Sequence, residues 1–196
     1  MEILLGFLVL AALMILAAQI FPRAWAALDA WRETRGKRVI VCPETGACAA
    51  VTLDRKLAAK TALAGTEELH LASCTRWPER AACGQECLAQ IESSSDGCLV
   101  RSRLDAWYAD TACALCGQRF GEIHWFDHKP GLLSPDQKAV GWHDVAAEDV
   151  PAVLATHEPI CWNCYVAEDF RAMHLDLVVE DPWHAAPRRG GDRKAS

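Results

Sequence analysis

Hydrophobic and polar positions divide the chain into an apolar N-terminal run and a mixed remainder. The run, residues 3–21, contains one Gln and no charged residue. As a helix it would measure about 28 Å, close to the hydrocarbon thickness of a bilayer, which predicts a transmembrane anchor over residues 1–22. A cleaved signal peptide is the alternative, because AWA at 24–26 fits a cleavage site. Two features favour the anchor: no Lys or Arg precedes the run, and it exceeds the usual length of a signal-peptide core.

Basic residues follow the apolar run. They lie in a predicted juxtamembrane linker over residues 23–38 and comprise Arg23, Arg32, Arg35, Lys37 and Arg38. Positive charge close to a membrane span tends to be retained in the cytoplasm. We therefore expect the N-terminus outside and the C-terminal domain in the cytoplasm, with the lipid bilayer as one partner.

Beyond the linker, short strand-like and helix-like patterns follow one another, which predicts an α+β fold. Two β-rich stretches flank a Pro-Glu-Thr-Gly turn within residues 37–54, a pattern typical of a hairpin. Residues 55–65 show no clear period. A helix is predicted from about Pro78 to the Ser-rich segment that begins at Ser93. Further short helices are predicted at residues 98–110, 148–157 and 166–174.

The net charge and the cysteine content limit the kinds of function that the sequence is compatible with. The net charge of −6 argues against a nucleic-acid partner, because phosphate binding needs a concentrated basic surface. The chain contains ten cysteines. In a reducing cytoplasm, clustered thiols are more often metal ligands or reactive groups than disulfides. If the orientation were reversed, the same ten could form five disulfide bonds.

Two CxxC pairs, in CALCG and CWNC, carry the most specific chemistry. They place Cys113, Cys116, Cys161 and Cys164 so that two turns supply four thiolates, the ligand set of a tetrahedral zinc site. The two motifs resemble the knuckles of a zinc ribbon, and this resemblance implies one bound zinc. The spacer of 44 residues is longer than the usual 15–20, so we expect a folded insertion between the knuckles. A thioredoxin-like redox site is disfavoured, because neither pair lies in a clear βαβ unit.

The remaining chain is divided around these motifs. We expect a Cys-rich hairpin-plus-helix region over 39–104, a zinc-ribbon-like region with a long insertion over 105–180, and a disordered tail over 181–196. The tail is rich in Pro, Gly and charge.

A second metal site is predicted in the Cys-rich region. Its expected ligands are Cys74, Cys83, Cys87 and Cys98, with Cys42 as a substitute for one of them. Cys83 and Cys87 are four residues apart, so a helix would place both thiols on one face. Disulfides and free buried cysteines are the alternatives. An iron–sulfur cluster is a further alternative to a second zinc, although no ferredoxin spacing is present.

Two histidines and several tryptophans lie between the knuckles. His124 and His128 are possible ligands, but the following Lys-Pro-Gly favours strand and turn over the helix that would bring both imidazoles to one metal. The tryptophans of this region are expected to shield the sulfur atoms, or to mark a protein interface if they are exposed: Trp107, Trp125, Trp142 and Trp162.

No catalytic signature is present: the sequence contains no GxSxG elbow, P-loop, HExxH or dinucleotide fingerprint. An anchor joined to a metal-stabilised module has the parts for docking. The sequence thus favours a non-catalytic zinc-binding accessory or assembly subunit of a membrane protein complex, with other subunits as partners. An iron–sulfur electron-transfer subunit and a metal or thiol sensor remain as alternatives.

Overall fold

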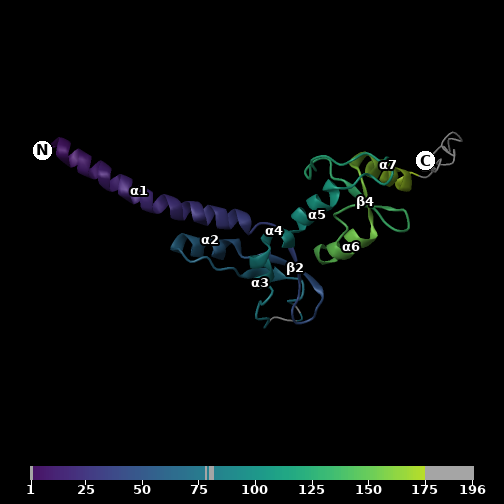
Figure 1. The fold of residues 1–196 in the computed structure, drawn as a ribbon, viewed down its shortest axis with the longest axis horizontal. Coiled ribbons are helices and arrows are strands. Elements are labelled where there is room, and N and C mark those ends of the chain that lie inside the picture. The colour runs from purple at the N-terminus through teal and green to yellow at the C-terminus, as the bar shows by residue number, and fades with distance from the viewer. Residues whose placement is uncertain (1, 78, 80–81, 175–196) are drawn as a thin grey trace, which may run out of the picture.

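The computed structural model describes residues 2–77, 79 and 82–174 (Figure 1). The predicted disordered tail at 181–196 lies outside these residues. The described residues form a mixed helix and sheet structure with two small antiparallel sheets. Helices α1 and α7 lie at opposite ends of the molecule (Figure 1).

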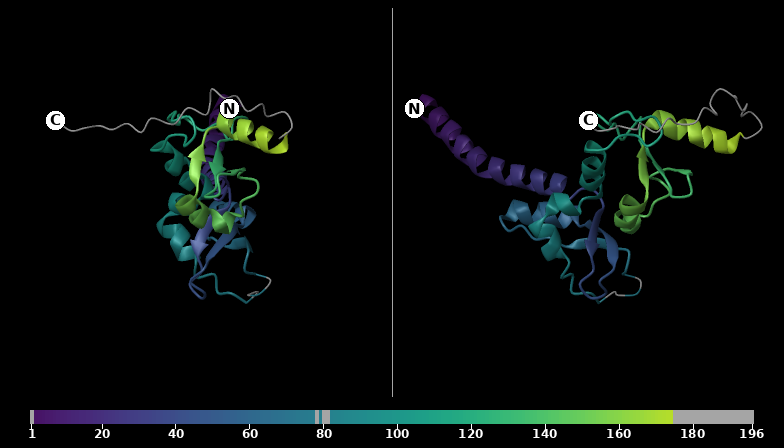
Figure 2. Two further views of the ribbon diagram at one scale, coloured as in Figure 1. Left: turned by 90° about the vertical axis from the view of Figure 1, so that its right-hand side faces the viewer. Right: turned by 45° about the vertical axis from the view of Figure 1, so that its right-hand side comes forward.

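Helix α1 (Glu2–Glu33) is one continuous helix of 32 residues with Pro22 inside it. It bends along its length in Figure 2, as expected where a proline removes a helical hydrogen bond. The segment predicted as a linker therefore begins as helix. Apolar side chains are exposed along α1, including Phe7, Met14 and Phe21. The part Leu13–Glu33 is long and apolar enough to cross a membrane, and a signal sequence would meet the same criteria.

Helix α2 (Arg55–Ala64) packs against the C-terminal part of α1, although its sequence showed no clear helical period. The contact is made by small side chains, since Ala30 of α1 is buried together with Ala58 and Ala62 of α2. Two local features determine where the helix begins and ends. The carboxylate of Asp54 accepts the first backbone N–H groups, and Gly65 caps the C-terminus. A narrow alanine contact does not generate a wide apolar stripe, which is why the period was weak.

The first sheet confirms the predicted hairpin. Strands β1 (Arg38–Val41), β2 (Cys48–Leu53) and β3 (Leu71–Cys74) pair antiparallel in the order β1-β2-β3. Helices α3 (Leu88–Ser93) and α4 (Ser95–Cys98) follow β3 along the chain. The core contains Ile91 of α3 together with sheet side chains that are almost fully buried: Ile40, Ala49, Val51, Leu53 and Leu71.

The predicted helix from about Pro78 to Ser93 is confirmed only from Leu88 onward and is wrong at residues 82–87. Helix α3 begins at Leu88, and Cys87 is its N-cap. The preceding segment turns instead, with Gln85 in the left-handed region at φ 58° directly after Gly84. Cys83 and Cys87 are therefore not neighbours on a helical face. The predicted helix at 98–110 is confirmed as α5 (Val100–Ala109).

Arg38 joins α1 to the first sheet. Its side chain is only 1% exposed, and its guanidinium donates to the backbone carbonyls of Glu33 and Arg35 at the end of α1. Burial lowers the pKa of this guanidinium. The backbone N–H of Val100 donates to the carbonyl of Lys37, so α5 starts at the same junction. Helix α1, the first sheet and α5 thus meet at the buried side chain of Arg38.

The second sheet carries the region between and around the CxxC pairs. Strands β4 (Gly131–Leu133), β5 (Ala139–Val140) and β6 (Glu158–Ile160) are antiparallel in the order β5-β4-β6. Before β6 come the short helices η1 (Ala147–Asp149) and α6 (Val150–Thr156), and after it comes α7 (Trp162–Met173). The predicted helices at 148–157 and 166–174 are confirmed.

Tyr108 of α5 is the centre of an aromatic cluster. Its ring is fully buried and contacts Trp107, Trp125, Trp142 and Phe120. Its hydroxyl donates to the carbonyl of Gly131 at 2.8 Å and accepts from Trp142 Nε1 at 3.0 Å. Burial raises the pKa of this phenol. Three of the four tryptophans expected over the sulfur atoms therefore pack around Tyr108 instead.

Candidate metal centre

The first CxxC pair lies on a tight turn that begins as a β-bridge between Ala112 and Arg119. The N–H of Cys113 donates to the carbonyl of Gln118 at 2.9 Å, and the N–H of Gly117 donates back to the carbonyl of Cys113 at 2.8 Å. Gly117 has φ 73°, a conformation that side chains disfavour, so a glycine is needed after the second cysteine. The turn presents both thiols of the pair on one side.

The second pair lies where strand β6 becomes helix α7. Cys161 is the N-cap of α7, and the N–H of Tyr165 donates to the carbonyl of Cys161 at 2.8 Å. Cys164 follows within the first turn of the helix. The N–H of Ala114 donates to the carbonyl of Pro159 at 2.9 Å, which joins the first turn to β6. The strand before this pair is antiparallel to its neighbour, so the pair is not part of a βαβ unit.

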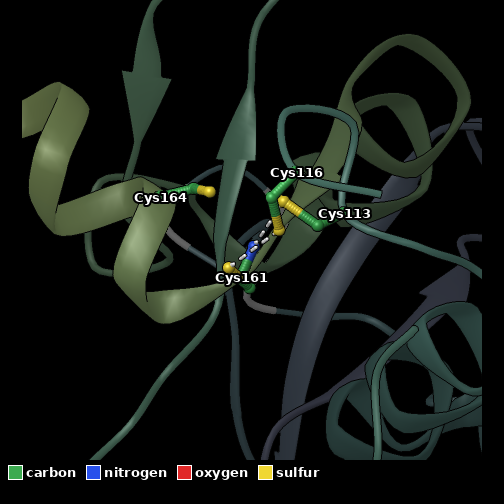
Figure 3. A group of neighbouring side chains, drawn as sticks. All are labelled: Cys113, Cys116, Cys161 and Cys164. Atoms are coloured by element: carbon green, nitrogen blue, oxygen red, sulfur yellow. Dashed lines mark hydrogen bonds between the residues drawn. The ribbon is translucent and has the colours of Figure 1, made fainter. Parts of the chain in front are cut away.

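The structure brings the four predicted cysteines together, although the two pairs are far apart in the sequence (Figure 3). Their sulfur atoms all lie within 4.8 Å of one another. The Sγ atoms of Cys116 and Cys161 are 3.8 Å apart, and all ten cysteines of the chain are free thiols. A tetrahedron with metal–sulfur bonds of about 2.3 Å has edges of about 3.8 Å. The donor set and its spacing fit one metal ion.

Backbone amides favour ionisation of the most buried ligand. Burial alone disfavours the thiolate of Cys113, which is 2% exposed. The N–H groups of Cys116, Cys161 and Leu115 outweigh this effect and lower the pKa of Cys113 to about 7; the Cys161 amide lies 3.3 Å from its sulfur. Hydrogen bonds to a thiolate stabilise its charged form.

The thiols of the second pair, Cys161 and Cys164, are in surroundings that disfavour their ionisation. Burial raises the pKa of Cys161 and of Cys164, and neighbouring thiols raise both further. Four adjacent thiolates repel one another, so they need a cation at their centre to ionise together. A divalent metal ion would supply that charge.

A small apolar cluster supports the site. Cys113 is buried with Leu133 of β4 and Ile160 of β6, and Leu115, Phe120 and Tyr165 pack around them. Cys116 is exposed, so the metal site lies near the surface. Of the large side chains in this cluster, only Leu133 and Ile160 are buried, and the others are partly buried around them.

The two candidate histidines lie beside the site in a turn, as the sequence indicated. The N–H of His128 donates to the carbonyl of His124, and the ring of His128 packs edge-on against Trp162 at 6.1 Å. Asp127 contacts the same imidazole at 3.4 Å. Within the described ranges, the tight ligand group contains the four cysteines and neither histidine.

The other cysteines are distributed differently from the sequence prediction. Cys98 lies in the core of the first sheet, where its thiol faces the carbonyl of Gln90 at 3.6 Å. The predicted substitute, Cys42, lies instead with the remaining three candidates around one small cavity: Cys74, Cys83 and Cys87. Cys48 is exposed at the start of β2.

Sequence reasoning missed the backbone groups that organise the first site. The amides of Leu115 and Ala114 and the carbonyl of Pro159 orient or join the two turns. The glycine after CALC was a usable indicator of the knuckle hydrogen bonding, whereas the Ala114–Pro159 contact depends on the tertiary fold.

No family model matches the sequence, and no curated protein or solved structure gives a match.

Proposed function

We propose that the chain is a non-catalytic, membrane-anchored zinc protein that serves as an accessory or assembly subunit of a membrane protein complex. The observation that carries this proposal is the continuity of α1, which runs from an exposed apolar segment to Glu33, whose carbonyl accepts a hydrogen bond from the guanidinium of Arg38. A helix that enters the bilayer would thus hold the metal-stabilised module at a fixed position near the membrane. This arrangement would suit a module that binds other subunits of a membrane complex.

The geometry of the sulfur cluster supports a single zinc ion. Four thiolates in a tetrahedral arrangement favour zinc or an iron–sulfur cluster. A cluster bonds its thiolates to different irons, which separates them more widely than one ion does. The grouping of all four sulfurs within 4.8 Å therefore favours one ion. Four protein ligands also leave no open coordination position, and this is typical of structural zinc rather than catalytic zinc.

The exposed charges near α1 support an orientation with the N-terminus outside and the module in the cytoplasm. Arg23, Arg32, Arg35 and Lys37 are all exposed in the fold. Arg38 is buried at the junction, so it serves the fold as well as adding to the positive charge of the segment. A reporter fused after Ser196 should be active in its cytoplasmic form only. Activity of a reporter that requires the outer compartment would refute this orientation.

An aromatic cleft provides a surface for the partner subunit. The cleft, of about 750 Å3, lies between α5 and the turn that follows Trp125, and Trp142 and Trp162 also line it. At its rim Phe126 is 91% exposed, with the guanidinium of Arg101 5.6 Å from its ring centroid. Aromatic residues and Arg are the side chains most enriched at the centres of protein interfaces. We assign this cleft to a protein segment of another membrane subunit.

Native gel electrophoresis of the tagged full-length chain, extracted from its own membranes in mild detergent, tests this assignment. We expect a discrete assembly that contains a reproducible second membrane protein. Phe126→Ala should release the chain from it, while Phe170→Ala, an exposed phenylalanine on α7, should not. Migration of the wild-type protein as a lone chain would contradict the proposal. A visible absorption band that bleaches with dithionite would instead indicate an electron-transfer subunit.

A further inference from the structure

The first sheet holds a second group of thiols around one cavity. Of the six cysteines outside the zinc-ribbon-like site, four line this cavity: Cys42, Cys74, Cys83 and Cys87. They come from the end of β1, the end of β3, the turn that follows and the N-cap of α3. The volume is about 20 Å3. That volume holds about one water molecule or one ion, which is too little for an organic substrate.

The turn at Cys42 has the same hydrogen bonding as the knuckle at Cys113. The N–H of Gly46 donates to the carbonyl of Cys42 at 2.8 Å, and the N–H of Cys42 donates to the carbonyl of Ala47 at 2.8 Å. Gly46 has φ 67°, close to the 73° of Gly117. CPETG therefore adopts the conformation of CALCG, with Thr45 at the position of the second cysteine.

This turn also directs donors at its sulfur atom. The hydroxyl of Thr45 and the backbone N–H groups of Glu44 and Thr45 hydrogen-bond to Cys42, which lowers the pKa of the thiol. The same amide positions, the second and third residues after the cysteine, donate to Cys113 in the first site. Cys42 is thus presented as a metal ligand by a knuckle that lacks its second thiol.

The thiols of Cys74, Cys83 and Cys87 lie where they could bind the same metal ion as Cys42. The N–H of Gln85 lies 3.4 Å from the sulfur of Cys83, because the left-handed conformation of Gln85 turns the chain back. The side-chain oxygen of Gln85 accepts the N–H of Leu71 at 2.9 Å, which fixes this turn to β3. Cys87 is only 4% exposed and lines the same cavity as Cys42, Cys74 and Cys83.

A cation from the protein lies at the same cavity. Arg76 lines it, and among the described residues the buried Nε of Arg76 has no hydrogen-bond partner. Its terminal nitrogen contacts Glu79 at 3.4 Å. A thiolate sulfur would accept the free N–H. Four thiolates around a divalent ion carry an excess of negative charge, which a neighbouring guanidinium offsets.

We propose that Cys42, Cys74, Cys83 and Cys87 form a second site for a single thiophilic divalent metal ion, such as zinc. Each thiol that is still protonated releases its proton when it binds the ion, and no electron is transferred. Within the described part of the chain, only the first site has all its ligand atoms within 4.8 Å. Binding at the second site therefore draws the sulfurs together and closes the cavity. Because the ligands come from separate segments, the ion would stabilise the first sheet against unfolding.

The size of the cavity favours a single ion over an iron–sulfur cluster. Such a cluster contains several irons and sulfides, whereas a volume of about 20 Å3 suits one ion. Cys98 is excluded from the set, since its thiol faces the carbonyl of Gln90 within the core. This proposal does not depend on the proposed membrane role, because it concerns metal content alone.

Metal analysis of the purified full-length protein in detergent, under reducing conditions, tests the proposal. We expect two zinc ions per chain in the wild type, one in Cys83→Ser, one in Cys161→Ser and none in the double variant. Cys98→Ala is the matched control, because it removes a buried thiol from the same core and should keep both ions. With cobalt in place of zinc, Cys83→Ser should halve the absorption of the tetrahedral thiolate complex. One ion in the wild type, or an unchanged count in Cys83→Ser, would overturn the proposal.

Thiol alkylation of the wild-type protein tests the same point without a variant. In the zinc-loaded protein Cys42, Cys74, Cys83 and Cys87 should be protected, and a chelator should make them reactive together. Cys48 should react throughout, because it is exposed and lies outside the set. Reactivity of the four thiols that does not respond to the chelator would refute the second site.

Discussion

Replacement of Cys113 by Ser tests the first metal site at its most buried ligand. Cys113 is 2% exposed and its sulfur accepts the N–H of Cys161 at 3.3 Å, so a hydroxyl there cannot reproduce the thiolate. Structural zinc contributes about 10–16 kcal/mol to a folded module, and an equal share per ligand is about 2.5–4 kcal/mol. At about 1.4 kcal/mol per factor of ten, the zinc affinity of Cys113→Ser should fall by about 10²–10³-fold.

Folding of the second sheet should follow the metal. The cluster around Cys113 buries Leu133 and Ile160 as its large aliphatic side chains. Together these contribute about 3–6 kcal/mol of hydrophobic stabilisation, well below the contribution expected from the ion. We therefore expect the region that contains β4, β6 and α7 to become sensitive to protease when zinc is lost.

The affinity is measured by competition with a chromophoric chelator, and the folding by limited proteolysis of the same samples. Cys48→Ser is the control, since that thiol is exposed and distant in the sequence from the site of Cys113. Zinc affinity within about threefold of the wild type would refute the assignment of Cys113 as a ligand. Loss of zinc with full protease resistance would refute the argument that the metal supports the fold.

Three further substitutions test the packing. Arg38→Met should lower the free energy of unfolding by about 2–4 kcal/mol, because the carbonyls at the end of α1 lose charged hydrogen-bond donors. Replacement of the exposed Arg35 by Met should change it little, and urea unfolding measures both variants. Gly131→Ala should cost about 1–3 kcal/mol in the same assay, because a Cβ there would meet a tyrosine ring of α7 at 2.5 Å, whereas Gly121→Ala has open space and should be neutral. Asp54→Ala should lower the free energy of unfolding by about 1 kcal/mol, because α2 loses its N-cap. If any of the three substitutions leaves the stability unchanged, the contact that it removes does not stabilise the fold as argued.

The sequence by itself determined the features that depend on local spacing. The turn at Cys113–Gly117 is closed by hydrogen bonds between residues close in the sequence, so the ligands Cys113 and Cys116 could be recognised before any fold was known. The Pro-Glu-Thr-Gly turn determined the first hairpin for the same reason. The apolar N-terminal run required a helix with exposed apolar side chains, although orientation and membrane insertion remain predictions.

Only the tertiary structure decided which distant thiols meet. Cys42 and Cys98 were both candidates for the second site, and their separation along the chain did not distinguish them. The first faces the cavity because a knuckle ends β1, while the second is buried against Gln90. The turn at Gln85 likewise replaced a helix whose pattern looked periodic. Local patterns fix local turns, but contacts between segments depend on how sheets and helices pack, and packing is a property of the whole chain.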